Sequence, residues 1–165
     1  VVVLALTMSM PPMIGRLLGA GDIEQIRKLV RLAVRFVVVW QLAIGLTLVV
    51  ASGLVSELFS SDSDVQKVLA GYLVRVPLSY SGLGVCMLMV SVCNALGLAM
   101  RALLVSTLRL FLCFLPLLWI GSQINGVYGL MSGALVGNLF AGAMAYSFYR
   151  AGMTRLKAEL ASGKA

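Results

Sequence analysis

The 165 residues are 61% hydrophobic, and only 12% carry a charge at neutral pH. A mean hydropathy of +1.02 excludes an ordinary soluble domain and predicts an all-α integral membrane protein. The net charge of +7 alone would be compatible with nucleic-acid binding, but the basic residues flank apolar segments and form no face with interleaved aromatic residues. We therefore expect membrane lipid, and no nucleic acid, as a partner.

The first apolar segment, residues 1–17, is somewhat shorter than the roughly 20 residues that cross a bilayer as a helix. It starts with neither Met nor a charged segment, so we expect the tail of a span from within a longer protein, and no signal peptide. Pro11 and Pro12 predict a break or bend, and the hydroxyls of Thr7 and Ser9 are expected to bind the carbonyls that the prolines free.

A basic segment, residues 15–35, follows this span. Gly19 and Gly21 are expected to allow a chain reversal, and Asp22 is expected to cap the next helix. Charged and apolar residues then alternate at helical spacing, which predicts a short amphipathic helix at the membrane surface. This helix is expected to run directly into the next span, the uncharged residues 36–56.

Three further spans and a polar, basic tail are predicted from the remaining hydropathy pattern. The spans cover residues 68–93, 102–120 and 127–149, and the tail covers residues 150–165. The connections are an acidic, serine-rich loop and two short turns, residues 57–67, 94–101 and 121–126.

Basic residues are concentrated on alternate connections. All 13 Lys and Arg residues except Lys67, Arg75 and Arg109 lie in the first connection, the third connection or the tail. The positive-inside rule then predicts a multi-pass protein of the cell (inner) membrane, with these connections and the C-terminus in the cytoplasm. The residues are Arg16, Arg27, Lys28, Arg31, Arg35, Arg101, Arg150, Arg155, Lys157 and Lys164.

Small residues occupy every fourth position of the last predicted span. Gly129, Gly133 and Gly137 lead into Ala141 and Ala145, and together they form a face that another helix can approach closely. We interpret this face as a helix-packing surface within the chain. A homodimer interface is the alternative.

Residues that could catalyse a reaction or hold a metal ion are scarce. The sequence has no His, and Cys86, Cys93 and Cys113 lie in apolar segments without a pair at metal-ligand spacing. No Asp or Glu lies within a predicted span to serve as a base. We therefore expect neither an enzyme nor a bound cofactor or metal.

Short motifs occur along the chain in a characteristic order. They are Gly15-Arg16-x-x-Gly19-Ala20-Gly21-Asp22, Phe59-Ser60-x-Asp62, Tyr72-Leu73-x-Arg75, Asn94-Ala95-Leu96-Gly97, Arg109 and Gly126-x-x-Gly129. Together with the predicted topology, they resemble the multidrug and toxic compound extrusion (MATE) transporters over nearly the whole chain. The resemblance implies part of one six-helix lobe, the second of two, from the tail of helix 8 to helix 12.

The resemblance implies a cation-coupled antiporter, driven by Na⁺ or H⁺, that exports drugs or organic cations by alternating access of two lobes. Such coupling needs a carboxylate at membrane depth. Because the predicted spans contain none, the coupling site is expected in the missing N-terminal lobe, the partner of this one. Two alternatives are a lipid-linked saccharide flippase of the same superfamily and a non-transporting scaffold that assembles through the glycine face.

The resemblance also implies that residues 1–17 and 68–93 line the cleft between the lobes, where a small amphipathic or cationic substrate would bind. Arg75 and Arg109 are the only charges at membrane depth, since Arg16 lies at the end of its span. For each we expect snorkelling or helix–helix hydrogen bonding, with a gating or substrate role as the alternative. The candidate cavity residues are soft or aromatic side chains of these spans, Met8, Met10, Met13, Tyr80, Met87 and Met89.

Overall fold

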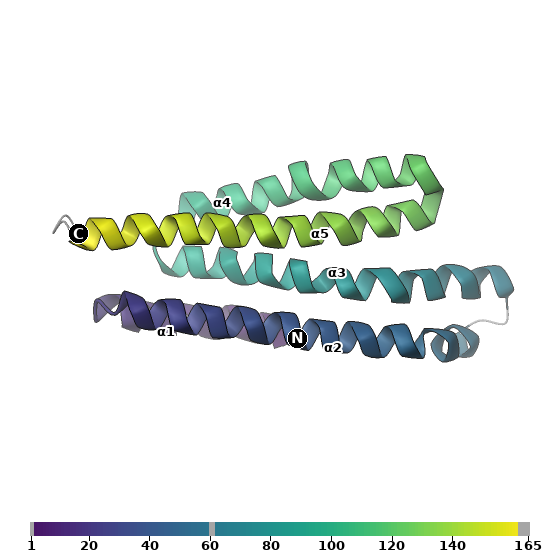
Figure 1. Cartoon of the computed structure of the whole chain (residues 1–165), viewed down its shortest axis with the longest axis horizontal. Coiled ribbons are helices and arrows are strands. Elements are labelled where there is room, and N and C mark those ends of the chain that lie inside the picture. The colour runs from purple at the N-terminus through teal and green to yellow at the C-terminus, as the bar shows by residue number, and fades with distance from the viewer. Residues whose placement is uncertain (1, 60–61, 162–165) are drawn as a thin grey trace.

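The computed structural model describes residues 2–59 and 62–161, and nearly all of them are helical (Figure 1). Val1, Ser60 and Lys164, used in the predictions above, lie outside the described residues, as do Ser61 and the rest of 162–165. The elements in chain order are α1 (Val2–Gly19), α2 (Ile23–Phe59), α3 (Ser63–Ala95), α4 (Ala99–Leu108), the π-helix η1 (Arg109–Phe114) and α5 (Leu115–Ala161). The predicted all-α membrane fold is confirmed.

The segment from α4 to the end of α5 is a helical hairpin. α4, η1 and the first turns of α5 run on as one rod, and α5 then reverses direction (Figure 1). At the reversal Asn125 and Gly126 leave the helical region, and Gly126 has a φ of 53°, which favours glycine. The described chain thus contains four helical segments long and apolar enough to cross a membrane, of which the last folds back on itself.

Consecutive passes are antiparallel, so connections collect at two ends of the bundle (Figure 1). The α1–α2 turn, the α3–α4 turn and the last turns of α5 lie at one end, and the α2–α3 connection and the α5 reversal lie at the other. Every described basic residue assigned above to the cytoplasmic side lies in the half of its membrane pass that is nearer to the first group of connections. Lys67 belongs to the second group, where it pairs with Asp64 at 3.1 Å.

The start of α2 has the structure that its sequence predicts. Gly21 adopts a φ of 71° in the turn, and the Asp22 carboxylate accepts a hydrogen bond of 3.0 Å from the Gln25 amide. On the first turns of α2, Ile26 and Val30 are buried while Lys28 is exposed. The amphipathic helix continues into the apolar segment without interruption, as expected.

α3 is the centre of the bundle. In its most apolar 18-residue window 61% of the residues are buried, compared with 11–17% for the other apolar helices. Leu88, Met89 and Val92 of α3 are fully buried against α1, α2 and α5. The outer helices expose apolar side chains such as Val50 and Leu54, as a surface that faces lipid requires.

The two arms of the hairpin are in backbone contact. A Cβ atom added to Gly129 would overlap the carbonyl of Gly121, and one added to Gly133 would overlap the carbonyl of Leu117. The next glycine along the face, Gly137, lies against the Cys113 carbonyl, 3.0 Å from where its Cβ would be. The chain's own preceding helix therefore occupies the glycine face.

Two local predictions differ from the structure. Of the break or bend predicted at Pro11 and Pro12, the break is wrong, because α1 is helical throughout. The turn predicted for residues 121–126 shrinks to Asn125 and Gly126, since residues 121–124 are still helical. Residues 150–161, the described part of the predicted polar tail, continue α5 as a helix.

Candidate functional site

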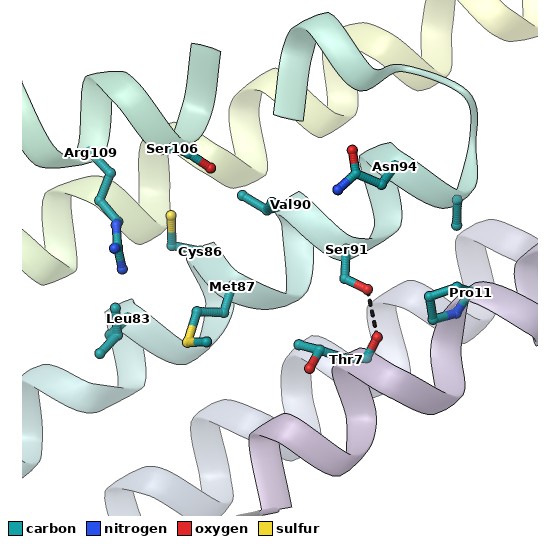
Figure 2. Close-up of a pocket in the computed structure, with 11 residues that line it drawn as sticks. Thr7, Pro11, Leu83, Cys86, Met87, Val90, Ser91, Asn94, Ser106 and Arg109 are labelled. Atoms are coloured by element: carbon teal, nitrogen blue, oxygen red, sulfur yellow. Dashed lines mark hydrogen bonds between the residues drawn. The ribbon is translucent and has the colours of Figure 1, made fainter. Parts of the chain in front are cut away.

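A cavity of about 880 Å³ lies between α1, α3 and the α4–η1 segment (Figure 2); we call it the main cavity. α1 contributes Thr7 and Pro11 to its wall, and the opposite helix contributes Ser106 and Arg109. The volume falls within the range of small-molecule sites, and the combination of an apolar wall with a few polar groups is typical of them. α3 contributes a stripe of residues at helical spacing, Leu83, Cys86, Met87, Val90, Ser91, Asn94 and Ala95.

The α1 side of the main cavity is shaped by Pro11. Because proline has no N–H, Pro11 cannot bond the carbonyl of Thr7, four residues earlier in the helix. The Ser91 hydroxyl of α3 donates a hydrogen bond of 2.7 Å to that carbonyl (Figure 2). The predicted donors act elsewhere, since the Thr7 and Ser9 hydroxyls bond the carbonyls of Leu4 and Leu6. Helix α3 thus supplies the bond that α1 lacks.

Arg109 begins the π-helix η1 on the other side of the cavity. The Leu115 amide bonds the Leu110 carbonyl, five residues back, and Pro116 follows immediately. A π-turn holds an extra residue and therefore shifts the side chains after it to new faces of the helix. From this junction the Arg109 side chain extends toward Leu83 and Cys86 of α3 (Figure 2).

A second cavity of about 300 Å³ lies between α3, η1 and α5 and shares Leu83 and Arg109 with the first. Its polar wall is a buried pair in which the Asn138 amide donates to the Ser79 hydroxyl at 3.1 Å. Tyr80 also lines it. Among the residues that the structure describes, Arg109 is the only charged residue in the lining of either cavity.

The six candidate cavity residues are placed differently from one another. Met87 lines the main cavity and Tyr80 lines the second. Met10 and Met89 are 2% and 0% exposed and belong to the core of the bundle. The two others, Met8 and Met13, are exposed outside both cavities.

Arg75 lies away from both cavities. Its Nη1 donates a hydrogen bond of 3.3 Å to the Gly71 carbonyl on its own helix, and its guanidinium carbon lies 5.7 Å from the ring centroid of Tyr128 on α5. Gly71 makes room for the Tyr128 ring, which a Cβ would overlap. The side chain therefore packs α3 against α5 through a cation–π contact.

Several cavity residues were absent from the prediction. Ser91, Cys86 and Asn94 belong to the α3 stripe, and Ser106 faces them from α4. The stripe repeats every three or four residues, which is the spacing of any one helix face, so the spacing does not show which face of α3 borders a cavity. The stripe's opposition to Pro11 is not readable either, because Ser91 and Thr7 are 84 residues apart in the chain.

The family model described as MatE matches residues 1–120. The chain belongs to the MATE family. It is therefore part of a multi-pass membrane transporter. Membrane lipid and the remainder of the transporter are therefore the surroundings of this chain.

Relatives of this MATE chain include a protein named FAD transporter from Shewanella oneidensis, which is 33% identical over 146 residues, covering 88% of this chain and 32% of the relative. The MATE transporter VcmN of Vibrio cholerae, solved in the bent form, is 50% identical with a TM-score of 0.87, over 93% of this chain and 35% of VcmN. An inward-facing multidrug resistance MATE family transporter, 18% identical with a TM-score of 0.84 over 94% of this chain and 36% of its own, shares the fold. The chain spans about a third of the length of these relatives.

Proposed function

We propose that the MATE protein to which this chain contributes exports an amphipathic compound that carries negative charge, by antiport against Na⁺ or H⁺. The main cavity is this chain's part of the substrate path. Arg109 is the observation that carries the proposal, because its guanidinium is the one charge lining the two described cavities. A charged side chain at membrane depth is costly unless it is paired or has a function.

The chemistry of the cavity fits a nucleotide-like amphiphile. A guanidinium binds phosphate oxygens in pairs, with two parallel hydrogen bonds. The apolar wall formed by Leu83, Met87 and Val90 suits an aromatic ring system. FAD combines a flavin ring with a diphosphate, and the relative from Shewanella oneidensis is named an FAD transporter. FAD is therefore the substrate we propose to test first.

An organic cation, which the motif resemblance implies as substrate, is the second candidate. At a separation of about 4 Å and an effective dielectric constant of about 20, its repulsion from Arg109 would cost about 4 kcal/mol. No carboxylate among the described lining residues offsets this cost. A cationic substrate would need a counter-charge from the rest of the transporter, which is also where we place the coupling carboxylate.

A scaffold that assembles through the glycine face is not proposed. The hairpin's own first arm lies against Gly129 and Gly133, so a second molecule could reach this face only by displacing it.

Transport by the full-length protein in proteoliposomes tests the proposal. FAD and the fluorescent cation ethidium would be followed separately under an imposed Na⁺ gradient and an imposed pH gradient. We expect FAD to move, and Arg109→Gln to lower its transport about tenfold or more, because a hydrogen bond to a charged group is lost. Arg75→Gln is the matched control, since it removes an intramembrane guanidinium outside both cavities.

The outcomes separate the two substrates. Ethidium transport without FAD transport would overturn the anionic-substrate proposal and favour the organic cation. Equal FAD transport by the wild-type protein and Arg109→Gln would remove Arg109 from the substrate path. If neither gradient drives either compound, the coupling proposal is wrong.

A further inference from the structure

A third pocket, of about 360 Å³, lies at the basic end of the bundle between α2 and the last turns of α5; we call it the basic pocket. It shares no lining residue with the two cavities described above. Arg27 and Arg31 line it from α2. α5 contributes Tyr146, Tyr149, Arg150, Met153 and Thr154.

Three arginines line the basic pocket, and no acidic residue lines it with them. Arg27 and Arg31 are one turn apart on α2 and therefore share a face, and Arg150 approaches from α5. No Asp or Glu lines the pocket, and the single ion pair recorded within the described chain is at the opposite end, between Lys67 and Asp64. Because like charges held close together repel, the pocket is electrostatically suited to an anion.

Tyr149 provides a second, independent observation at the same pocket. Its side chain is only 5% exposed, yet its hydroxyl is buried without a hydrogen-bond partner. In the described part of the chain no other buried side-chain nitrogen or oxygen lacks a partner. Leaving such a group unpaired costs about 1–3 kcal/mol, so an acceptor is expected beside it. Tyr149 lines the same pocket as the three arginines.

We propose that the basic pocket binds a phosphate group, held by Arg27, Arg31 and Arg150 and accepting a hydrogen bond from the Tyr149 hydroxyl. Arginine is well suited to this partner, because its planar fork matches two phosphate oxygens.

The position of the pocket favours the phosphate of an anionic phospholipid. α2 runs from Arg31 directly into its apolar segment, where Leu32, Phe36 and Val39 are exposed and available to acyl chains. Basic pockets between membrane helices on the cytoplasmic side bind cardiolipin or phosphoinositide headgroups in other proteins. Tyrosine is also enriched at the level of the headgroups.

Lipid retention by the full-length protein tests this proposal. The protein would be extracted from vesicles of phosphatidylcholine containing either cardiolipin or phosphatidylglycerol, and native mass spectrometry would measure the affinity of the retained lipid. We expect the anionic lipid to be retained over phosphatidylcholine. Arg31→Gln with Arg150→Gln should weaken its retention about 30-fold, at about 1 kcal/mol for each arginine. Tyr149→Phe, which keeps the ring, should weaken it about fivefold through the lost hydrogen bond.

Two arginines outside the pocket provide matched controls. Arg35→Gln and Arg155→Gln remove the same charge from the same half of the bundle and should leave retention nearly unchanged. Equal retention by the wild-type protein, the double variant and Tyr149→Phe would overturn the proposal. Equal losses in the pocket variants and in the controls would also overturn it, because they would indicate a general charge effect.

A second arm distinguishes a lipid from free phosphate. Delipidated protein in neutral detergent would be titrated with inorganic phosphate, and its thermal unfolding would be followed. If the lipid is the ligand, inorganic phosphate at millimolar concentration leaves the unfolding temperature unchanged. Cardiolipin then raises the unfolding temperature of the wild-type protein and not that of the double variant. A different result would separate the two ligands: inorganic phosphate stabilises the wild-type protein but not the double variant, and no lipid is selectively retained. This result would support a phosphate site and overturn its assignment to lipid.

Discussion

Single residues decide how α1 and α3 are joined at the main cavity. The carbonyl that Pro11 leaves without its helical partner is bound by Ser91 from the neighbouring helix. The same contact closes one side of the cavity (Figure 2). A proline and a serine far apart in the sequence therefore act as one structural unit.

This unit predicts a coupled pair of substitutions. Ser91→Ala should lower the free energy of unfolding by about 1 kcal/mol, because the Thr7 carbonyl loses its donor within the bilayer. Pro11→Ala combined with Ser91→Ala should recover most of this loss, since an alanine in place of Pro11 restores the helical N–H. Unfolding of the full-length protein in detergent with a chemical denaturant would compare Ser91→Ala, Pro11→Ala and the double variant with the wild-type protein.

A control for this cycle is Ser147→Ala. The Ser147 hydroxyl is exposed and bonds the Ala143 carbonyl on its own helix, so its removal should have little effect. Strictly additive effects of Pro11→Ala and Ser91→Ala would show that the two residues do not act together.

At the scale of the helices, the glycine face of the hairpin allows its two arms to approach until their backbones touch. A side chain on this face has no free volume, whereas Gly53 on α2 is exposed, and apart from its own stretch of helix no atom lies within 4 Å of the position that a Cβ would take. The glycine face therefore cannot accept a side chain, whereas position 53 can, although both have glycines in membrane helices.

Alanine substitutions should separate these positions. Gly133→Ala should destabilise the protein by about 1–3 kcal/mol, because the added methyl group forces the arms apart. Gly53→Ala should be neutral or stabilising by up to about 1 kcal/mol, since alanine is the better helix former. Denaturant midpoints in detergent would measure both variants, and size-exclusion chromatography should find an unchanged oligomeric state. Equal tolerance at the two positions would contradict the close packing of the arms.

The sequence is informative about helices and less so about which of their faces meet. The four-residue spacing of Gly129, Gly133 and Gly137 predicted a close-packing face, and the hydropathy pattern predicted the order of the helices. The partner of that face was not predictable, and Gly121, assigned to a turn, is helical and lies against Gly129. A contact between distant positions leaves no local pattern in one sequence.

The candidate site was hard to predict mainly because the sequence does not show how α3 is oriented about its own axis. A helix that is apolar all round has no polar face from which its orientation can be read. Met87 and Met89 are two positions apart, so they point in different directions, one into the main cavity and one into the core. Residue type alone could not separate them. The helix was identified correctly, and its cavity face required the tertiary structure.

At the scale of the whole molecule, charge distinguishes the two ends of the bundle. The turns and helix ends that carry Arg16, Arg101 and Arg155 lie together, and Lys67 lies at the other end (Figure 1). We propose that the end with Arg155 faces the cytoplasm, since basic residues are retained on that side.

Two variants, each with one added cysteine, test this orientation. Lys67→Cys should react in intact cells with a maleimide that cannot cross the membrane, whereas Lys157→Cys should react only after the cells are opened. Cys86, Cys93 and Cys113 are buried, so they should contribute little background. Labelling of both variants from outside intact cells would contradict the proposed orientation.

The contact between the hairpin's arms also limits how the molecule can change shape. Sliding one arm along the other would carry a bulky side chain into the gap that Gly121, Gly129 and Gly133 leave open. Such a movement would have to separate the two backbones along the whole length of their contact. During a transport cycle the two arms should therefore move together as one rigid body. Bending should be confined to the segments at either end of their contact.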